Sequence, residues 1–91
     1  MRARRRSVVD EYVEDGRAAV YSEEGMVVVL SELATVAWSV LGDDWVSADT
    51  VAAALVAEFG APDHEAAAPL ELTEQALRTL AEHALVDLDE A

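Results

Sequence analysis

Hydrophobic and polar positions follow a short period along the first third of the chain. Three apolar runs predict strands over residues 7–13, 17–22 and 26–30. The pair Asp15-Gly16 and the segment 23–25 separate these runs as tight turns. Turns this short join neighbouring antiparallel strands, so we expect a three-stranded meander.

After Ser31 the apolar positions change to the period of a helix. One face carries Leu33, Val36, Ala37, Val40 and Leu41. Ser31 is a suitable N-cap and Gly42 a suitable end for this helix. The third strand is therefore expected to run almost directly into the first helix, so that both contribute to one core.

Two further helices are predicted in the second half of the chain. Ser47 can cap the second helix, and Gly60 can end it. Residues 61–69 contain two prolines and are expected to form a loop. Thr73 is expected to cap the third helix, whose inner face would carry Leu77, Leu80, Ala81 and Ala84.

Three strands followed by three helices predict an α+β fold of winged-helix-like form. We expect one three-stranded antiparallel sheet that is covered on one face by the helices. The 91 residues suffice for one small core. We interpret 1–6 as a disordered basic arm, 7–88 as a single domain and 89–91 as a frayed tail.

The charges are separated by sign along the chain. Six basic and 19 acidic residues give a formal net charge of -13, and four of the arginines lie within the first six residues. Residues 7–91 therefore hold two arginines against all 19 acids, a charge near -17. Such a surface repels phosphate backbones and anionic lipids, so we expect neither a nucleic-acid nor a membrane partner. No secretory signal follows the arginines, and we expect a cytoplasmic protein.

The residue types offer little for catalysis. Without cysteine, the chain has no disulfide and no thiol nucleophile. Asp63, His64 and Glu65 could hold a metal, but adjacent residues rarely point at one ion, which favours a solvated loop. His83 suits the C-terminal end of a helix. We expect no enzyme activity, no metal and no cofactor.

The third predicted strand is the best candidate for binding. Residues 26–30 are consecutively apolar, without a charge or proline to protect an exposed edge. At the edge of the sheet this strand could accept an extended peptide as a further strand. It could equally be a buried central strand. Trp38 is expected to pack in the core, and Trp45 to cover the turn between two helices.

Residues 30–41, LSELATVAWSVL, resemble a pattern of the PqqD-like family, the precursor-peptide recognition elements. Members commonly read L-N-E-T-A-x-x-I-W-x-L-L-D-G, and the matching positions here are Leu30, Glu32, Ala34, Trp38 and Leu41. Residues 49–60 are similar to the family's second helix, and 80–86 to its closing segment. The chain departs from the pattern where the family has Asn, Ile and Gly, at Ser31, Ala37 and Ala84 respectively.

The resemblance implies a non-catalytic domain that binds the leader of a ribosomally made precursor peptide. The leader would pair antiparallel with the third strand, in a groove beside the third helix. A separate maturation enzyme, such as a radical enzyme or a lasso-type protease and cyclase, would then modify the peptide. Carried onto this sequence, the binding residues are Val27, Val28, Val29 and Leu30 on the strand and Leu77, Arg78, Ala81 and Leu85 on the helix.

Two details of this implied site are left open by the sequence. Strand side chains alternate, so either Val27 and Val29 or Val28 and Leu30 face the groove. Arg78 could pair with a leader carboxylate or be an ordinary surface residue. Two other functions are also considered: a winged-helix DNA-binding regulator, and a structural subunit whose strand pairs with an enzyme or forms a homodimer.

Overall fold

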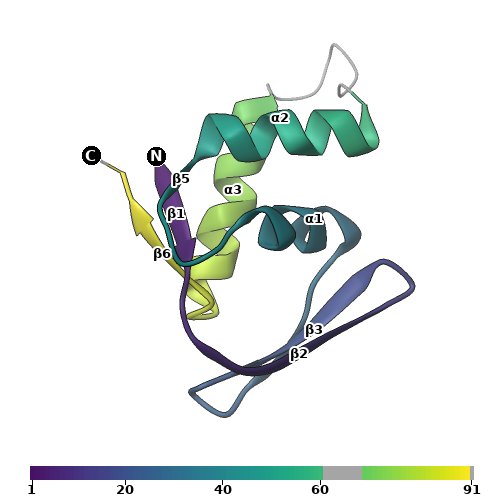
Figure 1. Ribbon diagram of the computed structural model, residues 1–91, viewed down its shortest axis with the longest axis vertical. Helices are drawn as coiled ribbons and strands as arrows, with labels where there is room; N and C mark the ends of the chain where they lie inside the picture. The colour runs from purple at the N-terminus through teal and green to yellow at the C-terminus, as the bar shows by residue number, and fades with distance from the viewer. Residues whose placement is uncertain (61–68, 91) are drawn as a thin grey trace.

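The computed structural model describes residues 1–60 and 69–90. Over these residues the chain forms three helices and two three-stranded antiparallel sheets, which confirms an α+β fold (Figure 1). The elements are β1 (Arg2–Arg5), β2 (Val8–Glu14), β3 (Arg17–Ser22), β4 (Val27–Val29), α1 (Glu32–Val40), β5 (Val46–Ser47), α2 (Ala48–Phe59), α3 (Pro69–Glu82) and β6 (Val86–Asp89).

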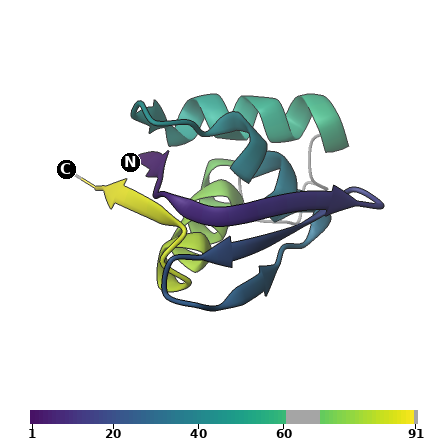
Figure 2. The ribbon, with the colours of Figure 1, turned by 60° about the horizontal axis from the view of Figure 1, so that its bottom comes forward.

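The expected meander is present as the sheet β2-β3-β4, with β3 in the middle (Figure 2). Asp15 and Gly16 both have positive φ, 53° and 76°, at the turn that joins β2 to β3. Two successive positive φ values match the right-handed twist of a hairpin, which is why an Asp-Gly pair is favoured there. The strand β4 pairs with β3 and ends the sheet.

The expectation of a single sheet and a disordered arm was wrong. Residues Arg2–Arg5 form β1, the central strand of a second sheet in the order β5-β1-β6. Arg2 lies opposite Asp89, and the next residue, Ala3, lies opposite Leu88 and is fully buried. The arm is ordered because it pairs with β5 and β6, two strands that lie far away in the sequence. Residue 89 is likewise part of a strand, β6, rather than of a frayed tail.

The first two helices begin where the sequence predicts. The side chains of Ser31 and Ser47 accept hydrogen bonds from the backbone N–H groups of Ala34 and Thr50. Gly60, with φ of 81°, follows α2 as its C-cap. The helix α1 ends one residue earlier than expected, because Leu41 in an extended conformation is its C-cap and Gly42 lies beyond it.

The third helix starts at Pro69, so the predicted cap at Thr73 was wrong. Proline is favoured in the first turn, where its missing N–H has no partner to lose. Thr73 lies one turn further on, is buried, and donates its hydroxyl to the carbonyl of Pro69. After α3 the backbone turns at Ala84, which has a positive φ of 60°.

One core joins both sheets to the helices. Its fully buried members come from β1, β3, the three helices and the segment after α3, and they include Ala3, Val20, Ala37, Val51, Leu77, Leu80 and Leu85. Trp38 belongs to this core, as predicted. Thr35 joins α1 to β3, because its hydroxyl accepts a hydrogen bond from the N–H of Ala18 at 2.9 Å. No helix in the described ranges is long and apolar enough to cross a membrane.

Candidate functional site

The strand β4 has one free long side in the part of the chain that the structure describes. Its residues pair with β3 in the register Val27 opposite Tyr21, Val28 opposite Val20 and Val29 opposite Ala19. No second strand pairs with β4 in either described sheet. The sequence had left open whether this strand is central or at an edge, and it is at an edge.

Two hydrogen bonds fix the direction of the backbone groups along this strand. The carbonyl of Met26 accepts from the N–H of Ser22 at 2.8 Å, and the N–H of Leu30 donates to the carbonyl of Ala18 at 2.8 Å. Even-numbered residues therefore point their backbone groups toward β3. Because this direction alternates along an antiparallel strand, Val27 and Val29 point theirs toward the open edge.

The side chains divide in the same alternating way. Val28 and Leu30 are 9% and 4% exposed and belong to the core. Val27 and Val29 are 53% and 61% exposed. The open question of orientation is thus answered for the free protein: Val28 and Leu30 support the strand, while Val27 and Val29 face away from the core.

The outer face of this sheet is partly apolar. Tyr12, Ala19 and Val29 lie side by side across the three strands, and Tyr21 lies beside Val27. Because alanine is small, a shallow hollow of about 220 Å³ forms here, with Glu14, Asp15 and Arg17 at its polar end. The two tyrosines and two valines are all exposed.

The two edges of this sheet differ in charge. The edge strand β2 carries Asp10, Glu11 and Glu14 among its seven residues. Charged side chains of this kind protect an edge against pairing with other chains. The edge strand β4 carries valine alone, and the nearest acidic residues in sequence are Glu24 and Glu32 beyond its two ends.

The implied helix residues do not form one exposed wall beside this strand. Leu77 and Leu85 are fully buried in the same core as Val28 and Leu30. Ala81 is half-buried at the border of that core. Arg78 is exposed, and its guanidinium donates to the carboxylate of Glu90 at 2.9 Å. The structure therefore does not bring these four residues together as a binding surface beside β4.

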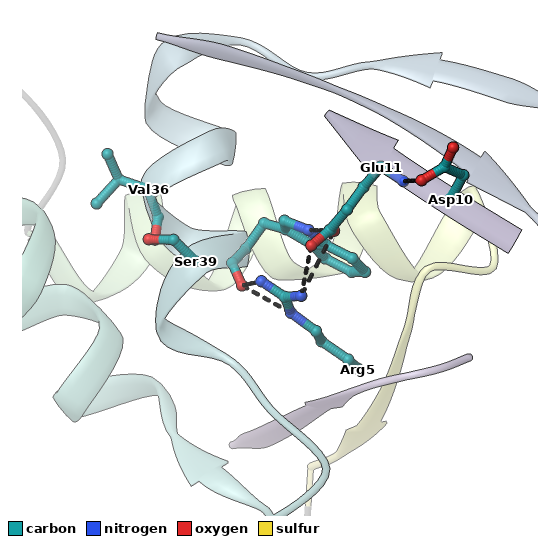
Figure 3. A network of polar contacts seen from close by, with 6 residues as sticks. Arg5, Asp10, Glu11, Val36 and Ser39 are labelled. Carbon is teal, nitrogen blue, oxygen red and sulfur yellow. Dashed lines mark hydrogen bonds and ion pairs between the residues drawn. The ribbon is translucent and has the colours of Figure 1, made fainter. Parts of the chain in front are cut away.

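A polar network around Trp38 was not predicted from the sequence (Figure 3). The guanidinium of Arg5 lies 4.1 Å from the centre of the Trp38 ring and donates to the Trp38 carbonyl at 2.7 Å. Glu11 accepts from both side chains, from Arg5 at 3.2 Å and from the indole Nε1 at 2.5 Å. The four arginines of the first six residues, in a chain with two tryptophans, are the signal that could have suggested it.

The other N-terminal arginines also have partners within the fold. Arg2 pairs with Asp89, and Arg4 pairs with Asp87. Arg4 also lies 4.4 Å from the ring centre of Trp45, which is half-buried. These cations contact the protein's own carboxylates and a tryptophan ring, so the N-terminal arginines are part of the fold.

A metal site finds no support in the described ranges. They contain no group of three or more histidine and acidic side chains that could hold a metal ion. The candidate ligands Asp63, His64 and Glu65 lie outside the described residues. His83 is exposed just after α3, and its backbone N–H donates to the carbonyl of Thr79.

No family model, curated protein or solved structure matches this chain. The resemblance to the PqqD-like family therefore stays a prediction from the sequence.

Proposed function

We propose that this protein is a peptide-binding domain of PqqD-like type, which takes up the leader of a ribosomally made precursor by strand addition and presents it to a maturation enzyme. The observation that carries the proposal is the open edge of β4. Val27 and Val29 there direct their backbone groups away from β3, toward a side where no other strand of the described ranges pairs with them. A strand that is added to such an edge gains main-chain hydrogen bonds, whatever its side chains are.

The contrast between the two edges supports β4 as the place of binding. Soluble proteins usually protect an edge strand with charge, proline or a bulge. The strand β2 has three acidic residues and an irregular register between Val8 and Asp10. The strand β4 has none of these devices, which suits an edge that is kept available for a partner.

The core beneath β4 supports the same proposal. Val28 and Leu30 anchor the strand in the buried core, the same cluster that contains Trp38 and Leu77. A strand that is held rigidly before binding loses less conformational entropy when the peptide is added. In this proposal Val28 and Leu30 hold the edge in place, while Val27 and Val29 contact the peptide. The chemistry on the peptide belongs to a separate enzyme, such as a radical enzyme or a lasso-type protease and cyclase.

The test is a titration with a fluorescently labelled leader peptide from the precursor gene beside this one. We expect binding in the micromolar range, and no binding at tens of micromolar would overturn the proposal for that leader. Val29→Pro removes an edge-facing N–H and should weaken binding about tenfold or more. Val9→Pro is the matched control, because Val9 is an exposed residue on the opposite edge strand.

The same edge also favours a second candidate, a structural module that pairs with a second copy through β4. Light scattering over a range of protein concentrations separates the two. A mass that rises to that of a dimer, and falls again in Val29→Pro, would favour self-pairing. A DNA-binding regulator is the third alternative, and salt-dependent binding to duplex DNA would support it, although the arginines of β1 and α3 already have partners.

A further inference from the structure

We infer that the helices carry a second interaction surface, which docks a basic segment of a partner protein through one large apolar side chain. Two hollows share the side chain of Phe59 on this surface, and one is apolar while the other is acidic. No residue of β4 lines either hollow. The inference therefore goes beyond the proposed strand addition and stands independently of it.

The apolar hollow lies where the three helices meet. Its walls include Leu33 of α1, Leu55, Val56 and Phe59 of α2, and Leu72 and Thr73 of α3. The hydroxyl of Thr73 already donates to the carbonyl of Pro69, so the hollow offers little to a polar ligand. Leu33 and Phe59 are 36% and 47% exposed, which leaves the hollow open to a partner.

The size of this hollow indicates what it can hold. Its volume is about 190 Å³. Pockets that enclose a drug-sized ligand measure roughly 300–1,000 Å³, whereas an apolar cavity of about 150 Å³ holds benzene. The apolar hollow therefore suits one large apolar side chain, such as leucine, that a protein partner inserts as an anchor.

The acidic hollow lies on the other side of Phe59, with a volume of about 320 Å³. It is formed by the start of α1, the end of α2 and the turn between β2 and β3 (Figure 1). Glu32 and Glu58 line it, both are exposed, and neither pairs with a basic side chain in residues 1–60 and 69–90. A lysine or arginine placed here meets two carboxylates and an aromatic ring, which also attracts cations.

The two hollows are joined through consecutive residues of the chain. Glu32 lines the acidic hollow and Leu33 the apolar one, and Glu58 likewise comes directly before Phe59. A partner that inserts an apolar side chain thus brings its neighbouring residues close to the two carboxylates. Basic residues next to the apolar anchor gain from this arrangement, which defines the occupant as a basic segment with one large apolar residue.

A second copy of this chain is a poor occupant. Each copy carries a net charge of -13, and like charges across an interface oppose association. Four of its arginines, Arg2, Arg4, Arg5 and Arg78, already form ion pairs within the fold. A partner with unpaired lysine or arginine has the complementary charge, and the field of the acidic chain also speeds their encounter.

Three pentapeptides test the inference: acetyl-KKLKK-amide, acetyl-KKSKK-amide and acetyl-EELEE-amide. Each is titrated into the isotope-labelled full chain at about 50 mM salt and followed by amide NMR signals. We expect the first peptide to shift the signals of Leu33, Phe59 and Leu72 and to bind about tenfold or more tightly than the serine peptide, which has no apolar anchor to bury. The glutamate peptide should not bind. Equal affinities of the leucine and serine peptides, or unchanged signals at these residues, would overturn the inference.

Surface variants locate the apolar contact. Phe59→Ser should weaken the leucine peptide about fivefold or more, because the anchor loses a wall of its hollow. Val9→Ser is the matched control, since Val9 is 72% exposed on β2 and lines neither hollow. It should leave the affinity unchanged. Equal weakening by the two variants would contradict docking in the apolar hollow.

A pair of double variants locates the charge contact. Glu32→Gln combined with Glu58→Gln should weaken the leucine peptide about threefold or more. Asp44→Asn combined with Glu82→Gln removes as many charges at exposed positions that line neither hollow. A smaller loss is expected there. Equal losses would show that net charge alone is responsible and would overturn the inference.

The edge of β4 supplies the comparison with the proposed function. Val29→Pro should leave the leucine peptide unaffected, and a leader bound at β4 should not compete with it. Competition, or a loss of binding in Val29→Pro, would place the pentapeptide at β4 and overturn this inference while strand addition stands. A leader that fails to bind while the leucine peptide still docks beside Phe59 would remove the proposed function alone.

Discussion

The guanidinium of Arg5 lies 4.1 Å from the centre of the Trp38 ring, and its Nη2 donates to the Trp38 carbonyl at 2.7 Å. The arginine thus covers the face of the ring and places a cation at the carbonyl end of α1, where the helix dipole favours it. Glu11 completes the arrangement from β2. One residue of β1 therefore connects a helix and the other sheet.

Replacement of this arginine should lower the stability of the whole fold. We expect Arg5→Ala to reduce the free energy of unfolding by about 1–3 kcal/mol, because it removes a cation–π contact and charge-assisted hydrogen bonds. Urea unfolding followed by tryptophan fluorescence measures the change. Arg6→Ala is the control, since Arg6 is exposed and its Nε comes no closer than 4.0 Å to the carboxylate of Asp87. This variant should lower the free energy of unfolding by less than about 0.5 kcal/mol. Equal losses would contradict the role of Arg5.

Thr35 should matter through its hydroxyl rather than its size. Thr35→Val keeps the shape but leaves the buried N–H of Ala18 without its acceptor, which costs about 1–3 kcal/mol. Thermal unfolding measures the loss, and amide exchange should be faster at Ala18. Thr79→Val serves for comparison, because Thr79 is exposed and its hydroxyl bonds only to Gln75 within α3. An unchanged Thr35→Val variant would argue against the bridge between α1 and β3.

The protein should be more stable with glycine at position 84. After α3, the N–H of Leu85 donates to the carbonyl of Leu80 and that of Ala84 to Ala81, the hydrogen bonds of a Schellman motif. This motif needs a left-handed residue, and Ala84 adopts a φ of 60°. We expect Ala84→Gly to raise the free energy of unfolding by about 0.5–1 kcal/mol, since it removes the strain of a Cβ at positive φ.

A glycine within an ordinary helix should have the opposite effect, which supplies the control. Ala53→Gly at an exposed position of α2 should lower the free energy of unfolding by about 1 kcal/mol. Chemical denaturation of both variants gives the comparison. A loss of stability in Ala84→Gly would contradict the interpretation of this helix end.

Proline scanning along β4 should alternate in its effect on folding. Val28→Pro removes a donor that points toward β3 and should cost about 2 kcal/mol or more. Val29→Pro removes a donor at the open edge, where proline is tolerated, and should cost less than about 1 kcal/mol. Urea unfolding of the two variants tests the direction of the backbone groups directly. Equal costs would mean that β4 has no free edge, and the binding experiments would lose their basis.

The parts of the fold that the sequence predicted are those with local signals. The turn at Asp15-Gly16, the caps Ser31 and Ser47 and the helix end at Gly60 each follow from the residue itself and its nearest neighbours. The edge strand β4 was also predicted as a strand, because its apolar run lies between a turn and a cap. The local sequence did not determine whether this strand lies in the middle or at an edge of the sheet.

The second sheet could not be predicted because its stability comes from distant residues. The strand β1 contains one apolar residue, Ala3, and otherwise arginine. Its arginines are held by Asp87, Asp89 and the two tryptophans, all of which lie far along the chain. For the same reason, the burial of Leu77 and Leu85 became visible only with the packing of α3.

The alternation of residues along β4 separates two kinds of evolutionary constraint. Val28 and Leu30 are tied to folding, whereas Val27 and Val29 contribute almost nothing to the core. Substitution at the second pair should therefore carry little penalty in foldability. If strand addition is its function, this fold could acquire new peptide specificities by changes at two surface positions, while the hydrogen bonds of the backbone keep a basal affinity for any extended chain.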